Sequence, residues 1–340
     1  MSFFSGDKGT LCKYLSLTED GGVRCSIFEN GLFRATQPKN LNDVLSESKV
    51  IGYFNKFSPM DKELVRVNLK RDNQLPDYEP SQKAIEMALK PASLRMTTER
   101  FPGLKGFTGG KETSELDISE FEEKVLGLNK MLVELLSQLF GVLSLSQNCL
   151  DELMWSHYAS EGRSICVEFD KSHEYFAFKR AEKVSYADEN RLQFSYYEGV
   201  MRFHGVKVLK DDNQNSLQER LLKVFYEDIG LESVVNSVLF AKSPRWNNEG
   251  ERRVLYKLED CDLVKESKNT DGNLEIGTSV YCAKVPFSAF KSVFLGYNIS
   301  DDERVNVLSA IAANSELSHV KIYDVKPSAW DKLKLEPIDF

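Results

Sequence analysis

The sequence lacks the features that mark membrane-spanning, secreted and zinc-binding proteins. In 340 residues no apolar run reaches the roughly 18 residues that a membrane helix needs, so we expect no membrane span. The opening residues MSFFSGDKGTLCKY have no basic segment followed by an apolar one, and they do not predict a secretory signal. The four histidines show no ligand spacing, so we expect neither a zinc site nor another bound metal.

The six cysteines also form no recognisable motif. They are scattered and include no Cys-x-x-Cys pair: Cys12, Cys25, Cys149, Cys166, Cys261 and Cys282. In a chain of this size, such a pattern is typical of reduced thiols in the cytoplasm. We therefore expect a cytoplasmic protein without disulfides.

Glycine-rich nucleotide loops are missing as well. GFTGGKET suggests a phosphate-binding loop, but Lys105 stands where that loop needs glycine, and Glu112 follows Lys111 where Ser or Thr is needed. The glycine fingerprint of dinucleotide-binding dehydrogenases is absent, which disfavours hydride transfer. With 44 Lys and Arg against 52 Asp and Glu, the net charge of −8 gives no long-range attraction to nucleic acid or anionic membranes.

The segments that are present indicate strands and helices in irregular order. Alternating apolar residues predict strands at LCKYLSL, LFRAT, SICVEFD and RVLYKL, with SICVEFD half-buried. The clearest helix is predicted from Ser119, where Ser119 and Glu122 form a capping-box pattern before an apolar stripe that repeats every 3.6 residues. We expect an α+β fold, built as a single domain over residues 1–340 with a variable helical and loop insertion at about 45–150.

The stretch AKSPRWNNEGERRVLY, residues 241–256, concentrates charge at the entrance of a predicted strand. Pro244 and the following asparagines disfavour a helix, so the strand is expected to begin near Glu249. Strand periodicity then places Glu249, Glu251 and Arg253 on the face opposite Val254. Two carboxylates at this spacing can couple their ionisation, and an arginine keeps the nearer one charged. A structural ion-pair cluster explains the same pattern.

A second cluster, WSHYA over residues 155–159, precedes a glycine turn and a buried strand. Trp155, His157 and Tyr158 together resemble the lining of a site. The alternative is that Trp155 and Tyr158 are core aromatics and that His157 lies at the surface. Lys13 and Tyr14 on the first strand, and Asn42 and Asp43 in a loop, are less informative alone.

In combination, these blocks resemble a large bacterial family of unknown function. Its members show a Lys-Tyr strand, an Asn-Asp-Pro loop, a Trp-x-His-Tyr-Ala block and a Trp-x-x-Glu-x-Glu-x-Arg block. The corresponding segments run in this order: K13-Y14, P38 to N42-D43, W155 to A159, E168-F-D170, K242 to R253 and F294-L-G296. The resemblance covers about residues 11–335. Leu41, Val44 and Gly250 depart from the pattern, which affects fine positioning around Asn42, Asp43 and the two glutamates.

The layout of this family is similar to that of ADP-ribosyltransferases. That resemblance implies a mixed or antiparallel β core with peripheral helices, and NAD as substrate. It implies that Lys13 or Tyr14 takes the first-strand position, Tyr158 the second, and Glu251 or Glu249 the catalytic position, with Glu251 preferred. The remaining residues that it implies in NAD binding are Asn42, Asp43, Trp155, His157, Lys242, Trp246 and Arg253.

The expected function is therefore NAD-dependent ADP-ribosyl transfer, as in a bacterial toxin or anti-phage effector. A carboxylate near the ribose would stabilise the oxocarbenium-like transition state, while Trp155 and Tyr158 stack on nicotinamide. Partners would be a macromolecular or nucleotide target and a defence-system protein, with no membrane. Two alternatives remain: a Mg-dependent nuclease using Glu168, Asp170, Glu249 and Glu251, and a non-catalytic sensor or binding module.

Overall fold

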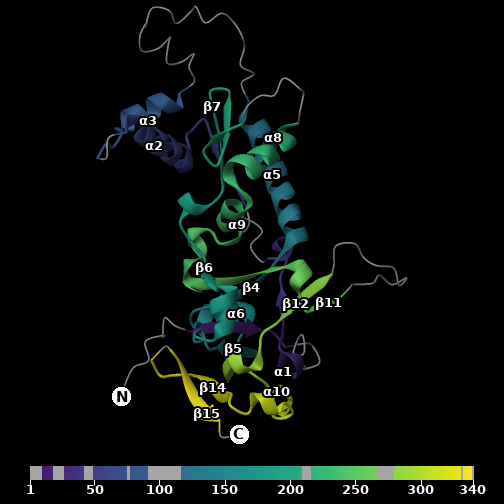
Figure 1. Cartoon of the computed structure of the whole chain (residues 1–340). Helices are drawn as coiled ribbons and strands as arrows, with labels where there is room; N and C mark the ends of the chain where they lie inside the picture. The colour runs from purple at the N-terminus through teal and green to yellow at the C-terminus, as the bar shows by residue number, and fades with distance from the viewer. Residues whose placement is uncertain are drawn as a thin grey trace, which may run out of the picture. The chain divides into compact units, whose positions relative to one another are not determined.

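The computed structural model describes residues 10–17, 27–41, 49–74, 77–90, 116–208, 216–265, 279–330 and 332–338 (Figure 1). The chain divides into two compact units. The first unit comprises Met1–Leu41, Leu136–Val184 and Arg245–Phe340. The second comprises Asn42–Leu135 and Ser185–Pro244, so it combines part of the expected insertion with a later segment.

The first unit is built on an eight-stranded sheet in the order β15-β14-β13-β5-β1-β4-β10-β6. Its strands are β1 (Leu11–Leu15), β4 (Phe140–Ser146), β5 (Ile165–Phe169), β6 (Glu182–Lys183), β10 (Glu251–Lys257), β13 (Phe290–Leu295), β14 (Lys321–Pro327) and β15 (Leu333–Ile338). Only the β13–β14 pair in this sheet is parallel. The predicted α+β class with a mixed sheet is confirmed.

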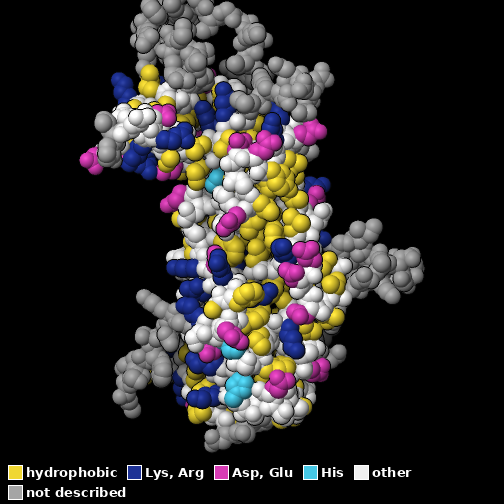
Figure 2. All heavy atoms as spheres, viewed as in Figure 1, with side chains coloured by type: hydrophobic (Ala, Val, Ile, Leu, Met, Phe, Trp, Pro, Cys, Tyr) yellow, Lys and Arg dark blue, Asp and Glu magenta, His cyan; other side chains and the backbone are white. Residues whose placement is uncertain are grey.

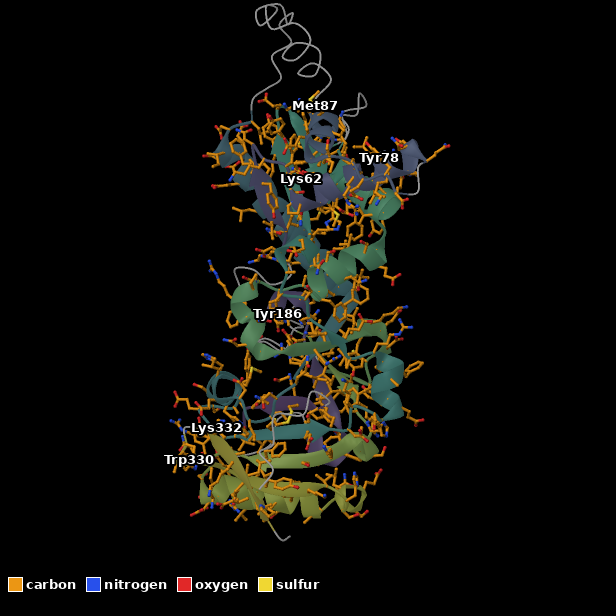
Figure 3. The ribbon with its side chains drawn as sticks, turned by 90° about the vertical axis from the view of Figure 1, so that its left-hand side faces the viewer. Lys62, Tyr78, Met87, Tyr186, Trp330 and Lys332 are labelled. Carbon is orange, nitrogen blue, oxygen red and sulfur yellow. A yellow bond between two sulfur atoms is a disulfide. The ribbon has the colours of Figure 1, made fainter. Side chains whose placement is uncertain are left out.

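A smaller sheet and several helices complete the first unit. The three strands run in the order β11 (Leu263–Lys265), β12 (Val280–Lys284) and β2 (Leu32–Ala35). The helices are α1 (Ile27–Asn30), α6 (Glu152–Tyr158), α7 (Glu174–Lys179) and α10 (Asp301–Ala312), together with the end of α5 (Ile118–Leu139). Figure 3 labels Trp330 and Lys332 in the turn between β14 and β15, where Trp330 is strongly exposed.

Two apolar clusters cover the large sheet. One contains Leu11, Val167 and Val254, and the other contains Cys12, Trp155 and Cys166. Because β5 lies between β1 and β13 at the centre of the sheet, all five of its residues are buried. The prediction of a half-buried SICVEFD strand is therefore wrong: the alternation of residue types does not correspond to a solvent-facing side.

The second unit contains a four-stranded sheet in the order β3-β7-β8-β9. Its strands are β3 (Ile51–Phe54), β7 (Gln193–Tyr197), β8 (Val200–Phe203) and β9 (Val206–Lys207). Its helices are α2 (Pro59–Asn73), α3 (Gln82–Leu89), α8 (Leu217–Lys223), a π-helical turn (Val224–Ile229) and α9 (Leu231–Leu239), with the start of α5. The predicted capping box of Ser216 and Glu219 is confirmed at the start of α8.

Among the residues that the structure describes, no helix is both long and apolar enough to cross a bilayer. Figure 2 shows charged side chains of both signs on the visible face. The segment GFTGGKET lies outside the described residues, as do Asn42 and Asp43.

Candidate active site

The centre of the candidate site is a hydrogen bond between the aromatic cluster at residues 155–159 and the charged stretch at residues 241–256. The hydroxyl of Tyr158 donates to Oε1 of Glu249 over 2.8 Å. Tyr158 is the last residue of α6, and Glu249 is the last residue of a 3-10 helix over Pro244–Glu249. Both residues are only partly buried, so the pair lies at the boundary between protein and solvent.

Local structure fixes the position of Tyr158. The side chain of Asp151 caps the first turn of α6 by accepting from the backbone N–H of Met154 over 3.0 Å. The helix ends at a turn in which Ser160, Glu161 and Gly162 have positive φ. Trp155 anchors the middle of the helix, because its ring N–H donates to the carbonyl of Cys149 over 2.9 Å and its side chain is fully buried.

Glu249 lies beside the end of β4 and just before β10, and it belongs to neither strand. β10 begins at Glu251, after Gly250 with a φ of +52°, so the prediction of a strand from Glu249 is wrong. Ser146, at the end of β4, donates from Oγ to the backbone carbonyl of Glu249 over 3.0 Å. The two glutamates therefore do not share a strand face, and each has its own environment.

Glu251 forms a buried ion pair with Arg253. The guanidinium donates from Nε to Oε1 over 2.8 Å and from Nη2 to Oε2 over 3.1 Å, with Arg253 fully buried. Burial lowers the pKa of Arg253, but its very high ordinary pKa and the bidentate partner keep the guanidinium charged. Both side chains lie opposite Val254, as the periodicity predicts.

Lys13 lies where β1 and β4 separate. Only Cys12 and Ser146 form a register pair between these strands, and the ammonium of Lys13 donates to the carbonyl of Ser144 over 3.0 Å. Burial lowers the pKa of Lys13 to about 8, although the Glu251 carboxylate acts in the opposite direction. Lys13 therefore loses its proton at a lower pH than an ordinary lysine.

Tyr14 and Trp155 support the site from the core. Their rings pack edge to face with centroids 5.3 Å apart. The Tyr14 hydroxyl donates to the Asn148 carbonyl over 2.7 Å, and burial raises its pKa. Since Trp155 has no exposed surface, it does not offer a face for stacking on nicotinamide, and the core-aromatic interpretation describes it correctly.

The other predicted residues come from several parts of the chain. His157 is exposed on α6, with its ring centroid 6.4 Å from that of Tyr158. Trp246 lies in the 3-10 helix that ends with Glu249. Lys242 belongs to the second unit, where its backbone N–H donates to the Ser185 carbonyl over 2.9 Å.

The four acids of the nuclease alternative do not assemble. In the described part of the chain, no three of Glu168, Asp170, Glu249 and Glu251 come within ligand distance of one another. Glu168 accepts from Lys291 over 2.8 Å, and Asp170 accepts from Ser172 in a local turn. This arrangement gives each acid a separate structural partner.

Sequence reasoning missed a group of three cysteines in the buried cluster against which Tyr158 packs. Cys12 and Cys149 form a disulfide with Cα atoms 5.5 Å apart, so the expectation of reduced thiols throughout is wrong. Cys166 is a free buried cysteine beside them. Because 137 residues separate the bonded pair, no local spacing indicates that these side chains meet.

Comparison with known proteins gives one match. No curated protein and no solved structure matches the chain. A family model described as a protein of unknown function, DUF2971, matches residues 154–254. The matched segment runs from α6 into β10 and includes both Tyr158 and Glu249. Residues 154–254 therefore carry a DUF2971 domain.

Proposed function

We propose that the first unit carries an ADP-ribosyltransferase-like active site that cleaves the nicotinamide–ribose bond of NAD, with Glu249 as its carboxylate. The observation that carries the proposal is the hydrogen bond from Tyr158 to Glu249. This bond joins the block around Tyr158 to the block around Glu249 and Glu251. The resemblance to ADP-ribosyltransferases implies the second-strand position for Tyr158 and the catalytic position for one of the two glutamates. The first unit has a mixed β-sheet with peripheral helices, which supports the proposal.

The chemistry assigns different roles to the two glutamates. Cleavage of a glycosidic bond passes through an oxocarbenium-like transition state, which a nearby carboxylate stabilises. Glu249 is partly exposed and oriented by a phenol, so a ribose can approach it. Both oxygens of Glu251 accept from Arg253, so Glu251 stabilises the start of β10 in this proposal.

The proposal is tested by incubating the full chain with NAD and measuring nicotinamide release. Glu249→Gln removes the charge but keeps the shape, and we expect it to lower the rate by about 100-fold. Glu259→Gln is the matched control, because Glu259 is an exposed acid just after the same strand. Transfer of labelled ADP-ribose to water, nucleotides or a macromolecule then identifies the acceptor.

Three outcomes would overturn the proposal. The first is wild-type protein that releases no nicotinamide and shows no NAD-dependent rise in melting temperature. The second is a Glu249→Gln variant that releases nicotinamide as fast as the wild type. The third is an NAD-dependent rise in melting temperature without nicotinamide release, which would indicate a binding module and not an enzyme.

A further inference from the structure

Three cysteine side chains from separate parts of the sequence meet inside the first unit. Their Sγ atoms all lie within 4.8 Å of one another, and all three side chains are buried: Cys12, Cys149 and Cys166. Cys12 belongs to β1, Cys166 belongs to β5, and Cys149 lies between β4 and α6. In the described residues this is the one group of three His, Cys, Asp or Glu side chains close enough to share a metal ion.

The sheet places two of these sulfurs on one face. β1 and β5 are adjacent antiparallel strands in which Tyr14 is opposite Cys166. Cys12 lies two residues before Tyr14, so both side chains point to the same side of the sheet as Cys166. Cys149 approaches from the connection to α6, where its carbonyl accepts from the Trp155 ring. The three sulfurs are therefore positioned by independent, well-packed segments.

The surroundings of the three cysteines are mainly apolar. The same buried cluster contains Tyr14, Trp155, Ala159, Phe294 and Val325. Glu168 lies opposite Cys12 on the neighbouring strand, and its carboxylate accepts from Lys291. An apolar shell of this kind limits the access of water, while thiolate ligands select soft metal ions.

We propose that, when the Cys12–Cys149 disulfide is reduced, these three cysteines bind one Cu(I) ion through their sulfur atoms. Metal–thiolate bonds of about 2.3 Å place three sulfurs of a trigonal site about 4 Å apart, so the bonded sulfurs of Cys12 and Cys149 must separate after reduction, while all three sulfurs already lie within 4.8 Å of one another. Zinc prefers a fourth ligand, and no fourth His, Cys, Asp or Glu joins this group among the described residues. Three sulfurs in an apolar shell match a three-coordinate soft ion.

The oxidised and metal-bound states exclude each other chemically. A dithiol reductant supplies two electrons and two protons to the Cys12–Cys149 bond and becomes a disulfide itself. Cu(I) binding then releases to solvent the protons of the thiols that become ligands, without a change in the oxidation state of the metal. Because the thiols lose their protons on binding, metal binding should strengthen as pH rises.

The test uses the full chain, reduced with a phosphine and kept under anaerobic conditions. Cu(I) is added in competition with a coloured Cu(I) chelator, and the copper retained per chain is measured. We expect one equivalent in the wild type and at least a tenfold weaker retention in Cys166→Ser. Cys282→Ser is the matched control, because Cys282 is also a fully buried cysteine, in β12. If Cys166→Ser retained as much copper per chain as the wild type, the proposal would be wrong.

A second measurement does not depend on any variant. The reduced protein is alkylated with and without one equivalent of Cu(I), and each cysteine is quantified by peptide mass spectrometry. We expect copper to slow the labelling of Cys12, Cys149 and Cys166 together, while partly exposed Cys261 reacts equally in both samples. The proposed copper site would be contradicted if copper left the labelling of the three cysteines unchanged. It would also be contradicted if copper slowed the labelling of Cys261 instead.

Discussion

Tyr158 and Glu249, 91 positions apart in the sequence, are joined by a hydrogen bond of 2.8 Å between the phenol and the carboxylate. The contact closes the end of α6 against the segment that leads into β10. Without the hydroxyl, Glu249 keeps its charge but loses the group that orients it. The contribution of orientation can therefore be measured separately from that of charge.

The first prediction concerns Tyr158→Phe. A hydrogen bond to a charged group contributes about 1.5–3 kcal/mol, so we expect kcat for nicotinamide release to fall at least about 10-fold. KM for NAD should change little, because the ring remains in place. Steady-state kinetics measures both values, and Tyr226→Phe is the control, since Tyr226 is an exposed tyrosine. A rise in KM at constant kcat would show that Tyr158 binds NAD instead of orienting Glu249.

The second prediction concerns the ion pair of Glu251 and Arg253. Arg253→Met removes the bidentate partner of the buried Glu251 carboxylate, and breaking such a pair should lower the free energy of unfolding by about 3–5 kcal/mol. Urea denaturation measures the loss. The double variant Arg253→Met with Glu251→Gln should recover part of it, because the remaining charge is also removed.

Arg163→Met is the matched control for that experiment. Arg163 also pairs with a glutamate two residues away, but its side chain and that of Glu161 are 63% and 69% exposed. An exposed pair contributes less than about 1 kcal/mol. A similar loss in Arg163→Met and Arg253→Met would contradict the role assigned to burial.

Much of the fold follows from periodicity and capping, because these signals are local. The 3.6-residue stripe predicts α5, although Asp117 caps the helix instead of Ser119, as its carboxylate accepts from the backbone N–H of Glu120 over 2.8 Å. Alternation likewise predicts β1 and β10. Local signals do not reveal which strands lie at the centre of a sheet, so the full burial of β5 was missed.

The sequence names the residues of the candidate site but not how they pair. The sequence identifies Tyr158, Glu249 and Glu251, yet strand periodicity treats the two glutamates as equivalent. Gly250 makes them different, because its positive φ ends the 3-10 helix and starts β10 at Glu251. The meeting of Cys12, Cys149 and Cys166 depends on strand order, which no short motif encodes.

The third prediction is a pH dependence caused by Lys13. Its pKa is about 8 in the folded protein, below the ordinary lysine value of 10.5, so the unfolded chain binds more protons between these values. The contribution of Lys13 to stability should therefore increase as pH rises from about 8 towards 10.5. The difference in unfolding free energy between wild type and Lys13→Met, measured in urea at each pH, isolates this contribution. A difference independent of pH would contradict the lowered pKa.

The last prediction concerns His204 in the second unit. Burial lowers the pKa of His204 to about 4, and its Nδ1 is buried without a hydrogen-bond partner among the described groups. Because the unfolded histidine binds its proton near pH 6.5, wild-type stability should fall as pH drops from about 6.5 to 4. His204 has a φ of +49°, which asparagine also tolerates, so His204→Asn removes the titration without backbone strain. Urea denaturation across this range should show a smaller loss in His204→Asn, whereas equal losses would assign the acid sensitivity to other groups.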